Sequence, residues 1–238
     1  MTLTSYQIRE SRRAKYVNIK VSPHGSVEVV VPPNFDRHHL SEILAKRQGW
    51  ITKTLNRLQA ERLALSLESD DPCPTEIHFR SVDHHWSVQY CHQASHAITL
   101  TMTGDRALTL TGPIDDIALC QQALRAWLRQ QAKAILIPWL LRISQEQNLP
   151  IQTISVRRQK TRWGSCSSQR NISLNDKLLF LPPQLVGSVL IHELCHTLEM
   201  NHSAAFWALV ADRDPHYAES DRLLDTAWRY IPNWVEPH

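Results

Sequence analysis

One short stretch of the sequence has the residue types and the spacing of a metal-binding site. Residues 192–196 read His-Glu-Leu-Cys-His, an H-E-x-x-H motif. In a helix, side chains four residues apart lie on one face, so His192 and His196 can bind the same metal ion. Glu193 is then placed beside the metal, where its carboxylate can take a proton from bound water. Zinc suits nitrogen ligands, and the motif predicts a zinc-dependent hydrolase.

A third histidine follows at a distance that fits the same metal. His202 lies six residues after His196, and catalytic zinc sites use three protein ligands with a fourth position left to water. The spacing is that of the metzincins, but Glu199 stands where they have a glycine that turns the chain. We expect Asn201 to make this turn in a left-handed conformation and Ser203 to cap the next helix. Other residues could supply the third ligand instead: Asp212, His216 or Glu219.

The cysteines and the other histidines give weaker signals. The chain has five cysteines, and no two form a C-x-x-C pair, so no disulfide framework is predicted. Cys195 points away from the face of the two helical ligands, and we expect it to be buried, as we do Cys166. A further group of cysteines and histidines lacks zinc-finger spacing and should scatter over both faces of its strands. Its members are Cys73, His78, His84, His85, Cys91, His92 and His96.

A basic and aromatic segment precedes the H-E-x-x-H motif. Residues 156–166 contain four cations and a tryptophan. An edge strand beside a metal helix can bind an extended peptide, and its cations can bind a carboxylate, a phosphate or a nucleic-acid backbone. A solvated strand with Trp163 in the core is the alternative. The candidate substrate-binding residues are Arg162, Trp163, Ser165 and Tyr217, and the candidate oxyanion donors are Arg162, His216 and Tyr217.

The first 70 residues are predicted to form a β-hairpin and a long helix. Two β-branched runs, 16–21 and 27–31, are joined by a glycine-containing turn. Apolar residues then recur at helical steps from Asp36 to about Leu65. The acidic, proline-punctuated stretch 68–74 follows, and we expect a domain boundary there.

The remainder is predicted to contain sheet and helix in succession. Alternating residues favour three or four antiparallel strands over 75–111, and a helical pattern with Pro138 inside it should be kinked or split. The further expected elements are a helix from Asp115, strands at 151–158 and around 171–174, a helix from Pro182-Pro183 through the H-E-x-x-H motif, and short helices from Ser203 and about His216. We therefore expect an α+β fold in three parts, 1–70, 71–113 and a metallohydrolase core over 114–238.

Composition narrows the classes of protein. The content of 42% hydrophobic and 21% charged residues is that of a globular protein. The net charge of +3 is too small to indicate nucleic acid by itself. The most apolar stretch, 134–143, is too short to span a membrane, and no signal peptide is visible. We expect a cytoplasmic protein with free thiols and no membrane partner.

Several motifs together resemble the YgjP-like metallopeptidase domain family. They are RWGSCSS, ISLNDKLLFLPP, HELCH and NHSAAFW, with SRRAKYVNIKVSPHGSVEVVVPP and QGWI nearer the start. The family is allied to the SprT-like and WLM zinc proteases and to a compact gluzincin-type, zincin-like fold. The resemblance implies one family domain over about 5–232, with an active-site helix packed on a small antiparallel sheet.

The resemblance also implies roles for individual residues. His192, His196 and His202 would bind one zinc ion, and Glu193 would be the catalytic carboxylate. Asn201 and Ser203 match the family's residues around the third ligand, and Phe206-Trp207 match a packing pair. The chain departs from the family at Asp176-Lys177, where an aromatic residue and a cation are more usual. The resemblance therefore does not predict which residues form the wall of the cleft.

Three functional hypotheses follow. The leading one is a metallopeptidase, acting on a peptide or protein with zinc-bound water activated by Glu193. A metal-dependent nucleotide phosphohydrolase is the second, with residues 157–162 holding the phosphates. The third is a nucleic-acid- or protein-binding module with a structural zinc, and a DNA-associated protease would combine it with the first. Structural zinc sites usually have four ligands, often cysteines, which argues against the third.

Overall fold

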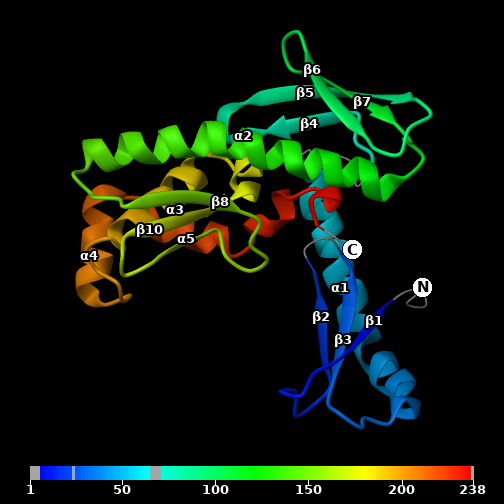
Figure 1. Cartoon of the computed structure of the whole chain (residues 1–238). Helices are drawn as coiled ribbons and strands as arrows, with labels where there is room; N and C mark the ends of the chain where they lie inside the picture. Colours follow the sequence, from blue (N-terminus) through cyan, green and yellow to red (C-terminus); the bar gives the residue numbers. More distant parts are fainter. Residues whose placement is uncertain (1–5, 23–24, 65–70, 237–238) are drawn as a thin grey trace. The chain divides into compact units, whose positions relative to one another are not determined.

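The computed structural model describes residues 6–22, 25–64 and 71–236. The chain divides into two units, residues 1–67 and 68–238 (Figure 1). Parts of two expected features lie outside the described residues: the tip of the first hairpin turn at 23–24, and residues 65–70, which include the expected helix end and the start of the 68–74 boundary. Each unit is described by itself below.

The first unit has a three-stranded sheet and one long helix. Strands β2 and β3 form the expected antiparallel hairpin, while β1, which sequence reasoning missed, pairs in parallel with β3. Alternate valines of β3 and apolar residues of α1 form the core, because one face of each element is apolar. The elements are β1 (Gln7–Glu10), β2 (Asn18–Val21), β3 (Val27–Val31), the short helix η1 (Arg37–His39) and α1 (Leu40–Ala64).

The second unit begins with a four-stranded sheet in the order β4-β5-β7-β6. The expectation of purely antiparallel strands was wrong for one pair, since β5 and β7 are parallel. The reason is that the β6–β7 hairpin folds back with β7, not β6, against β5. The elements are β4 (Glu76–Phe79), η2 (Arg80–Val82), β5 (His84–His92), β6 (Thr99–Thr103) and β7 (Ala107–Gly112).

Helix α2 (Ile117–Glu146) lies between this sheet and the remainder of the unit (Figure 1). The Asp116 carboxylate caps it by accepting the Leu119 N–H at 3.1 Å. We expected Pro138 to kink or split the helix, and the helix is not split, since it runs unbroken from Ile117 to Glu146. A proline removes one helical hydrogen bond, and Leu136 and Leu140, fully buried on either side, hold both halves against the same core.

The remainder of the second unit places the H-E-x-x-H motif. It has a three-stranded sheet in the order β8-β10-β9, in which β8 and β10 are parallel and β9 and β10 antiparallel, so the sheet is mixed and not purely antiparallel. The fold class is α+β, as predicted. The elements are β8 (Thr153–Arg157), β9 (Gly164–Cys166), β10 (Asn171–Asn175), η3 (Asp176–Phe180), α3 (Pro183–Cys195), α4 (Ala204–Arg213), α5 (Tyr217–Leu224), η4 (Ala227–Tyr230) and η5 (Asn233–Val235).

Candidate metal centre

Helix α3 carries the H-E-x-x-H motif at its C-terminal end. Pro183 occupies its first turn, where a missing N–H costs nothing. Leu190 and Leu194 are fully buried on the face turned to the core. His192 and His196 lie on another face, one turn apart, as the spacing predicts. The burial of the apolar face therefore fixes the direction in which the two imidazoles point.

The three histidines of the prediction come together, and two of the three distances between their Nε2 atoms fit a tetrahedral metal site. The Nε2 atom of His192 lies 3.2 Å from Nε2 of His196 and 3.2 Å from Nε2 of His202. Two nitrogens bound to one tetrahedral zinc at about 2.0–2.1 Å are about 3.3–3.4 Å apart. The ring planes cross at 81°, 38° and 80°, so one point can lie near all three planes. The residues present fit a zinc ion.

The turn that returns His202 to the other two histidines is made by backbone hydrogen bonds. The N–H groups of Thr197 and Glu199 donate to the carbonyls of Leu194 and Cys195 as α3 ends. Asn201 does not take the left-handed conformation that we expected, since the described residues with positive φ do not include it. The expected cap is present, because the Ser203 hydroxyl accepts the N–H of Phe206 at 3.3 Å.

Phe206 holds the three imidazoles together. Its ring centroid lies 5.0 Å from that of His192, 4.3 Å from that of His196 and 4.9 Å from that of His202. The side chain is fully buried and packs with Cys195 and Val210. Cys195 is thus a core residue, as predicted, and burial raises the pKa of its thiol to about 11.

Hydrogen bonding and burial prepare the histidines as ligands. The carbonyl of Glu199 lies 2.9 Å from Nδ1 of His196, which donates to it and so leaves the Nε2 lone pair for a metal. Burial, and then the two neighbouring imidazoles, lower the pKa of His192 to about 4. Burial likewise lowers the pKa of His196. Metal ligation requires neutral imidazoles, and these groups are neutral near pH 7.

Glu193 is a buried carboxylate with an unused acceptor. Its side chain is 6% exposed, and Oε2 has no hydrogen-bond partner among the described residues. Burial raises its pKa to about 8, and the charge of Arg162 opposes this rise. A cation held by the three histidines would lower this pKa again, because opposite charge favours the carboxylate. An orphaned carboxylate oxygen beside three converging imidazoles fits a metal site with its water.

Gly164 makes room for Glu193, and sequence reasoning missed this contact. A Cβ atom at Gly164 would lie 2.6 Å from Oε1 of Glu193, closer than such atoms approach. Gly164 is the first residue of β9, which pairs with β10. The glycine in the RWGSC stretch was the available signal, since an isolated strand glycine often marks a close approach.

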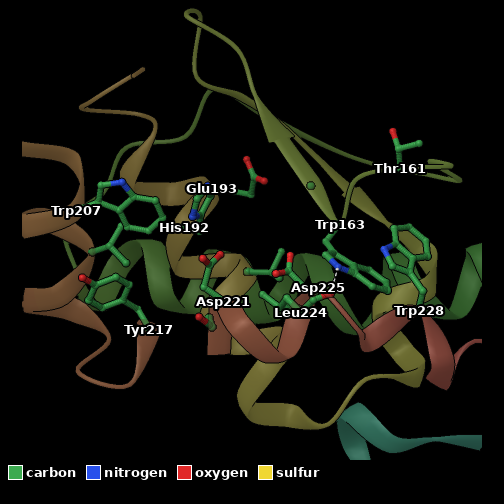
Figure 2. A pocket seen from close by; sticks show the side chains of 14 residues that line it. Thr161, Trp163, His192, Glu193, Trp207, Tyr217, Asp221, Leu224, Asp225 and Trp228 are labelled. Atoms are coloured by element: carbon green, nitrogen blue, oxygen red, sulfur yellow. Dashed lines mark hydrogen bonds between the residues drawn. The ribbon is translucent and has the colours of Figure 1, made fainter. Parts of the chain in front are cut away.

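A cavity of about 300 Å³ opens beside the metal centre (Figure 2). Two of the four predicted substrate-binding residues, Trp163 and Tyr217, line it together with His192 and Glu193. Ser165 is not among its lining residues and pairs with Ser173 in the sheet. Arg162 does not line it either, although its charge acts on Glu193.

One cation of the basic segment 156–166 and one nearby lysine form internal ion pairs. Arg158 binds the fully buried carboxylate of Asp176 at 2.7 Å. The equally buried Lys177 pairs with Glu236. The departure from the family pattern at Asp176-Lys177 therefore lies in the interior, not in the wall of the cleft. This removes Arg158 from the set of cations available to a phosphate.

The alternative third ligands are not part of the cluster. Among the described residues, the donors grouped with His192 and His196 include His202 and none of Asp212, His216 and Glu219.

Of the seven cysteines and histidines at 73–96 that we expected to scatter, only His78 and His85 belong to a cluster of possible ligands among the described residues. His78 and His85 are cross-strand partners of β4 and β5, and their ligand atoms lie within 4.8 Å of each other and of Asp83.

An α+β fold with three imidazoles and a buried carboxylate at the end of one helix is the arrangement of a metal-dependent hydrolase. The family model described as "YgjP-like, metallopeptidase domain" matches residues 15–227, and the chain belongs to this family. The suspected family is thereby confirmed. Membership implies a divalent metal, typically zinc, and a protein or peptide substrate.

Two further comparisons complete these findings. The metallopeptidase zymogen of Pyrococcus abyssi abylysin is similar to this chain at 23% identity with a TM-score of 0.35, over 41% of this chain and 99% of that one. No curated protein matches the sequence. Within the described residues, no helix has the length and apolar character needed to cross a membrane.

Proposed function

We propose that the chain hydrolyses peptide bonds, with one zinc ion held by His192, His196 and His202 and with Glu193 as general base. The observation that carries this proposal is the convergence of three Nε2 atoms, 3.2 Å apart in two pairs, beside an unpartnered buried carboxylate. When bound, zinc polarises the scissile carbonyl and lowers the pKa of water.

Glu193 moves the proton in this mechanism. Its carboxylate accepts a proton from the attacking water while the water oxygen bonds to the carbonyl carbon. The same carboxyl group then donates the proton to the amine nitrogen as the C–N bond breaks. Gly164 leaves the space that this position requires, and burial keeps bulk water from competing for the carboxylate.

The surroundings of Glu193 favour a peptide over a nucleotide. Strand β9 is an outer strand of its sheet and begins at Gly164, beside the carboxylate, so its free edge can pair with an extended peptide. Of the three candidate oxyanion donors, Tyr217 lines the cavity with His192, and we assign it this role. None of the described residues lining the cavity is a lysine or an arginine, as a phosphate would require.

The substitution Glu193→Gln tests this function. We expect the variant to bind zinc as the wild-type chain does and to lose about 10²- to 10⁴-fold in turnover, because general base catalysis is removed. Cleavage of a broad peptide mixture by both zinc-loaded proteins, followed by mass spectrometry, measures the loss. A parallel assay for phosphate release from nucleotides is expected to be negative. Undiminished peptide cleavage by the variant would contradict the mechanism.

A further inference from the structure

One face of α5 is turned to the cavity beside the metal centre. The residues of this face recur at helical steps, as i, i+4, i+7 and i+8, which places them on one side of the helix. They are Tyr217, Asp221 and Leu224 of α5 and its C-cap residue Asp225, and all of them line the cavity. Figure 2 shows the side chains of Asp221 and Asp225 between those of His192 and Trp163. The two aspartates therefore lie where a substrate side chain next to the scissile bond would enter.

Acidic side chains line this cavity, and no lysine or arginine is among the described residues that line it. Asp221 and Asp225 are exposed, and their carboxylates make no hydrogen bond or ion pair with the described residues. The lining also includes Glu193, whose buried oxygen is unpartnered. The nearby cation Lys177 lies over the ring of Trp228, at 4.9 Å from its centroid, but it pairs with Glu236 and does not line the cavity. A guest with positive charge would supply the partner that the two aspartates lack.

The walls of the cavity suit the apolar stem of a long side chain. Trp163 stacks on Trp228 with centroids 4.1 Å apart, and Trp207 stacks on Tyr217 at 5.5 Å. All four rings line the cavity. Lysine and arginine bury their methylene stems along apolar surfaces and keep the charged head near polar groups, and aromatic faces attract cations. A volume of about 300 Å³ suits one such side chain.

We infer that this cavity selects peptides with a lysine or arginine next to the scissile bond, and that Asp221 and Asp225 are the specificity-determining residues. The inference rests on the proposed function, because it assumes that the bond to be cleaved lies at the metal centre. Hydrogen bonds to charged groups predict a preference of about 10- to 100-fold over an uncharged side chain of the same length.

The direct test measures binding, which does not depend on turnover. The probes are a fluorescent peptide cleaved by the wild-type chain, or a generic extended peptide if none is cleaved, and copies with lysine, arginine, norleucine or glutamate at the tested position. Zinc-loaded Glu193→Gln protein should bind the lysine and arginine peptides about 10- to 100-fold more tightly than the norleucine peptide. Adding Asp221→Asn and Asp225→Asn should remove that difference. Equal binding of the four peptides, or a preference that survives both substitutions, would overturn the inference.

Two controls separate this inference from the proposed function. Glu219→Gln removes the same charge from the exposed side of α5, away from the cavity, and should leave the preference intact. The charge reversal Asp221→Lys with Asp225→Lys should transfer the preference to the glutamate peptide. If the wild-type chain cleaves no peptide but still binds the cationic peptides more tightly, only the proposed function is contradicted. Cleavage without a cationic preference would contradict the inference only.

Discussion

Two clusters in the second unit each bring three possible metal ligands within 4.8 Å, and they differ in the direction of their rings. At the end of α3, the planes of His192, His196 and His202 cross at 81°, 38° and 80°. On the β4–β5 hairpin, the rings of His78 and His85 stack at 3.8 Å with their planes only 16° apart. A metal lies in the plane of each imidazole that binds it, and nearly parallel planes share no nearby point. Proximity of ligand atoms is therefore not sufficient for two histidines to bind the same metal ion.

The surroundings of the two clusters differ as well. Phe206 packs on all three rings of the first cluster, in which His196 is buried and His202 is exposed, whereas His85 and Asp83 of the second cluster are 70% and 85% exposed. Asp83 takes a positive φ of 52° at the turn and its carboxylate accepts from Nε2 of His78 at 3.0 Å. The hairpin histidines thus already have a partner and a stacking contact. We assign the metal to the first cluster and a hydrogen-bonded turn to the second.

The largest effect that separates the clusters is on metal content. His196→Ala should reduce the zinc content from about one per chain to near zero, because a catalytic site has only three protein ligands. His85→Ala should leave it unchanged. Elemental analysis after dialysis measures both. Two zinc ions in the wild-type chain, with one lost in His85→Ala, would show that the hairpin cluster also binds a metal and would contradict the difference between the two clusters.

The contact between Gly164 and Glu193 gives the next effect. In Gly164→Ala the new Cβ would meet Oε1 of Glu193 at 2.6 Å, so the carboxylate must move. A displacement of this size in a catalytic group costs about 10²-fold in kcat, with zinc retained. Gly187→Ala on α3 is the matched control, since its Cβ meets nothing within 4 Å. It should keep full activity and stabilise the fold by about 1 kcal/mol. Equal kcat values in the two variants would exclude this role of Gly164.

Removal of the ring that packs on all three histidines should weaken the metal site without abolishing it. We expect Phe206→Ala to lower zinc affinity by about 10- to 100-fold, the range seen when ligands lose their supporting contacts. Phe180→Ala, at an equally buried ring away from the site, should cost a similar 3–5 kcal/mol or so of stability and leave zinc affinity unchanged. Competition with a chelating dye measures the affinity. An equal loss of zinc affinity in Phe180→Ala would mean that general loosening of the fold causes the loss.

The smallest effect concerns the hairpin cluster and pH. Burial lowers the pKa of His78 below its ordinary value of 6.5, although Asp83 opposes this. The imidazole is neutral in both states above that value, so its contribution to stability changes only below it. As pH falls below 6.5 the unfolded chain binds the proton more readily, and the folded state loses stability. His78→Gln should show a shallower loss of melting temperature between pH 6.5 and 5. Parallel curves of melting temperature against pH for the variant and the wild-type chain would show that His78 does not contribute to the loss of stability.

Local patterns in the sequence were enough to predict the helix of the metal centre. The four-residue spacing of the histidines, Pro182-Pro183 before the helix and the cap at Ser203 each act within a few residues, and each is present in the structure. The α+β class follows from similar periodicities. The long helix α2 was also predicted, but the tolerance of Pro138 depends on core packing from other elements.

Contacts between segments far apart in the sequence could not be predicted from local patterns. The approach of Gly164 to Glu193 joins β9 to α3, and the pairing of His78 with His85 depends on strand register. The ion pair of Arg158 with Asp176 turned an expected surface cation into an interior one. Asp221 and Asp225 gave no sequence signal, because an acidic pair on a short helix is most often solvated.

Anomalous diffraction from crystals of the zinc-loaded chain, measured on both sides of the zinc edge, tests the central claim most directly. The expected result is one peak, at about 2.0–2.1 Å from Nε2 of His192, His196 and His202. A peak between His78 and His85, or a ligand set in which Glu219 replaces His202, would contradict it.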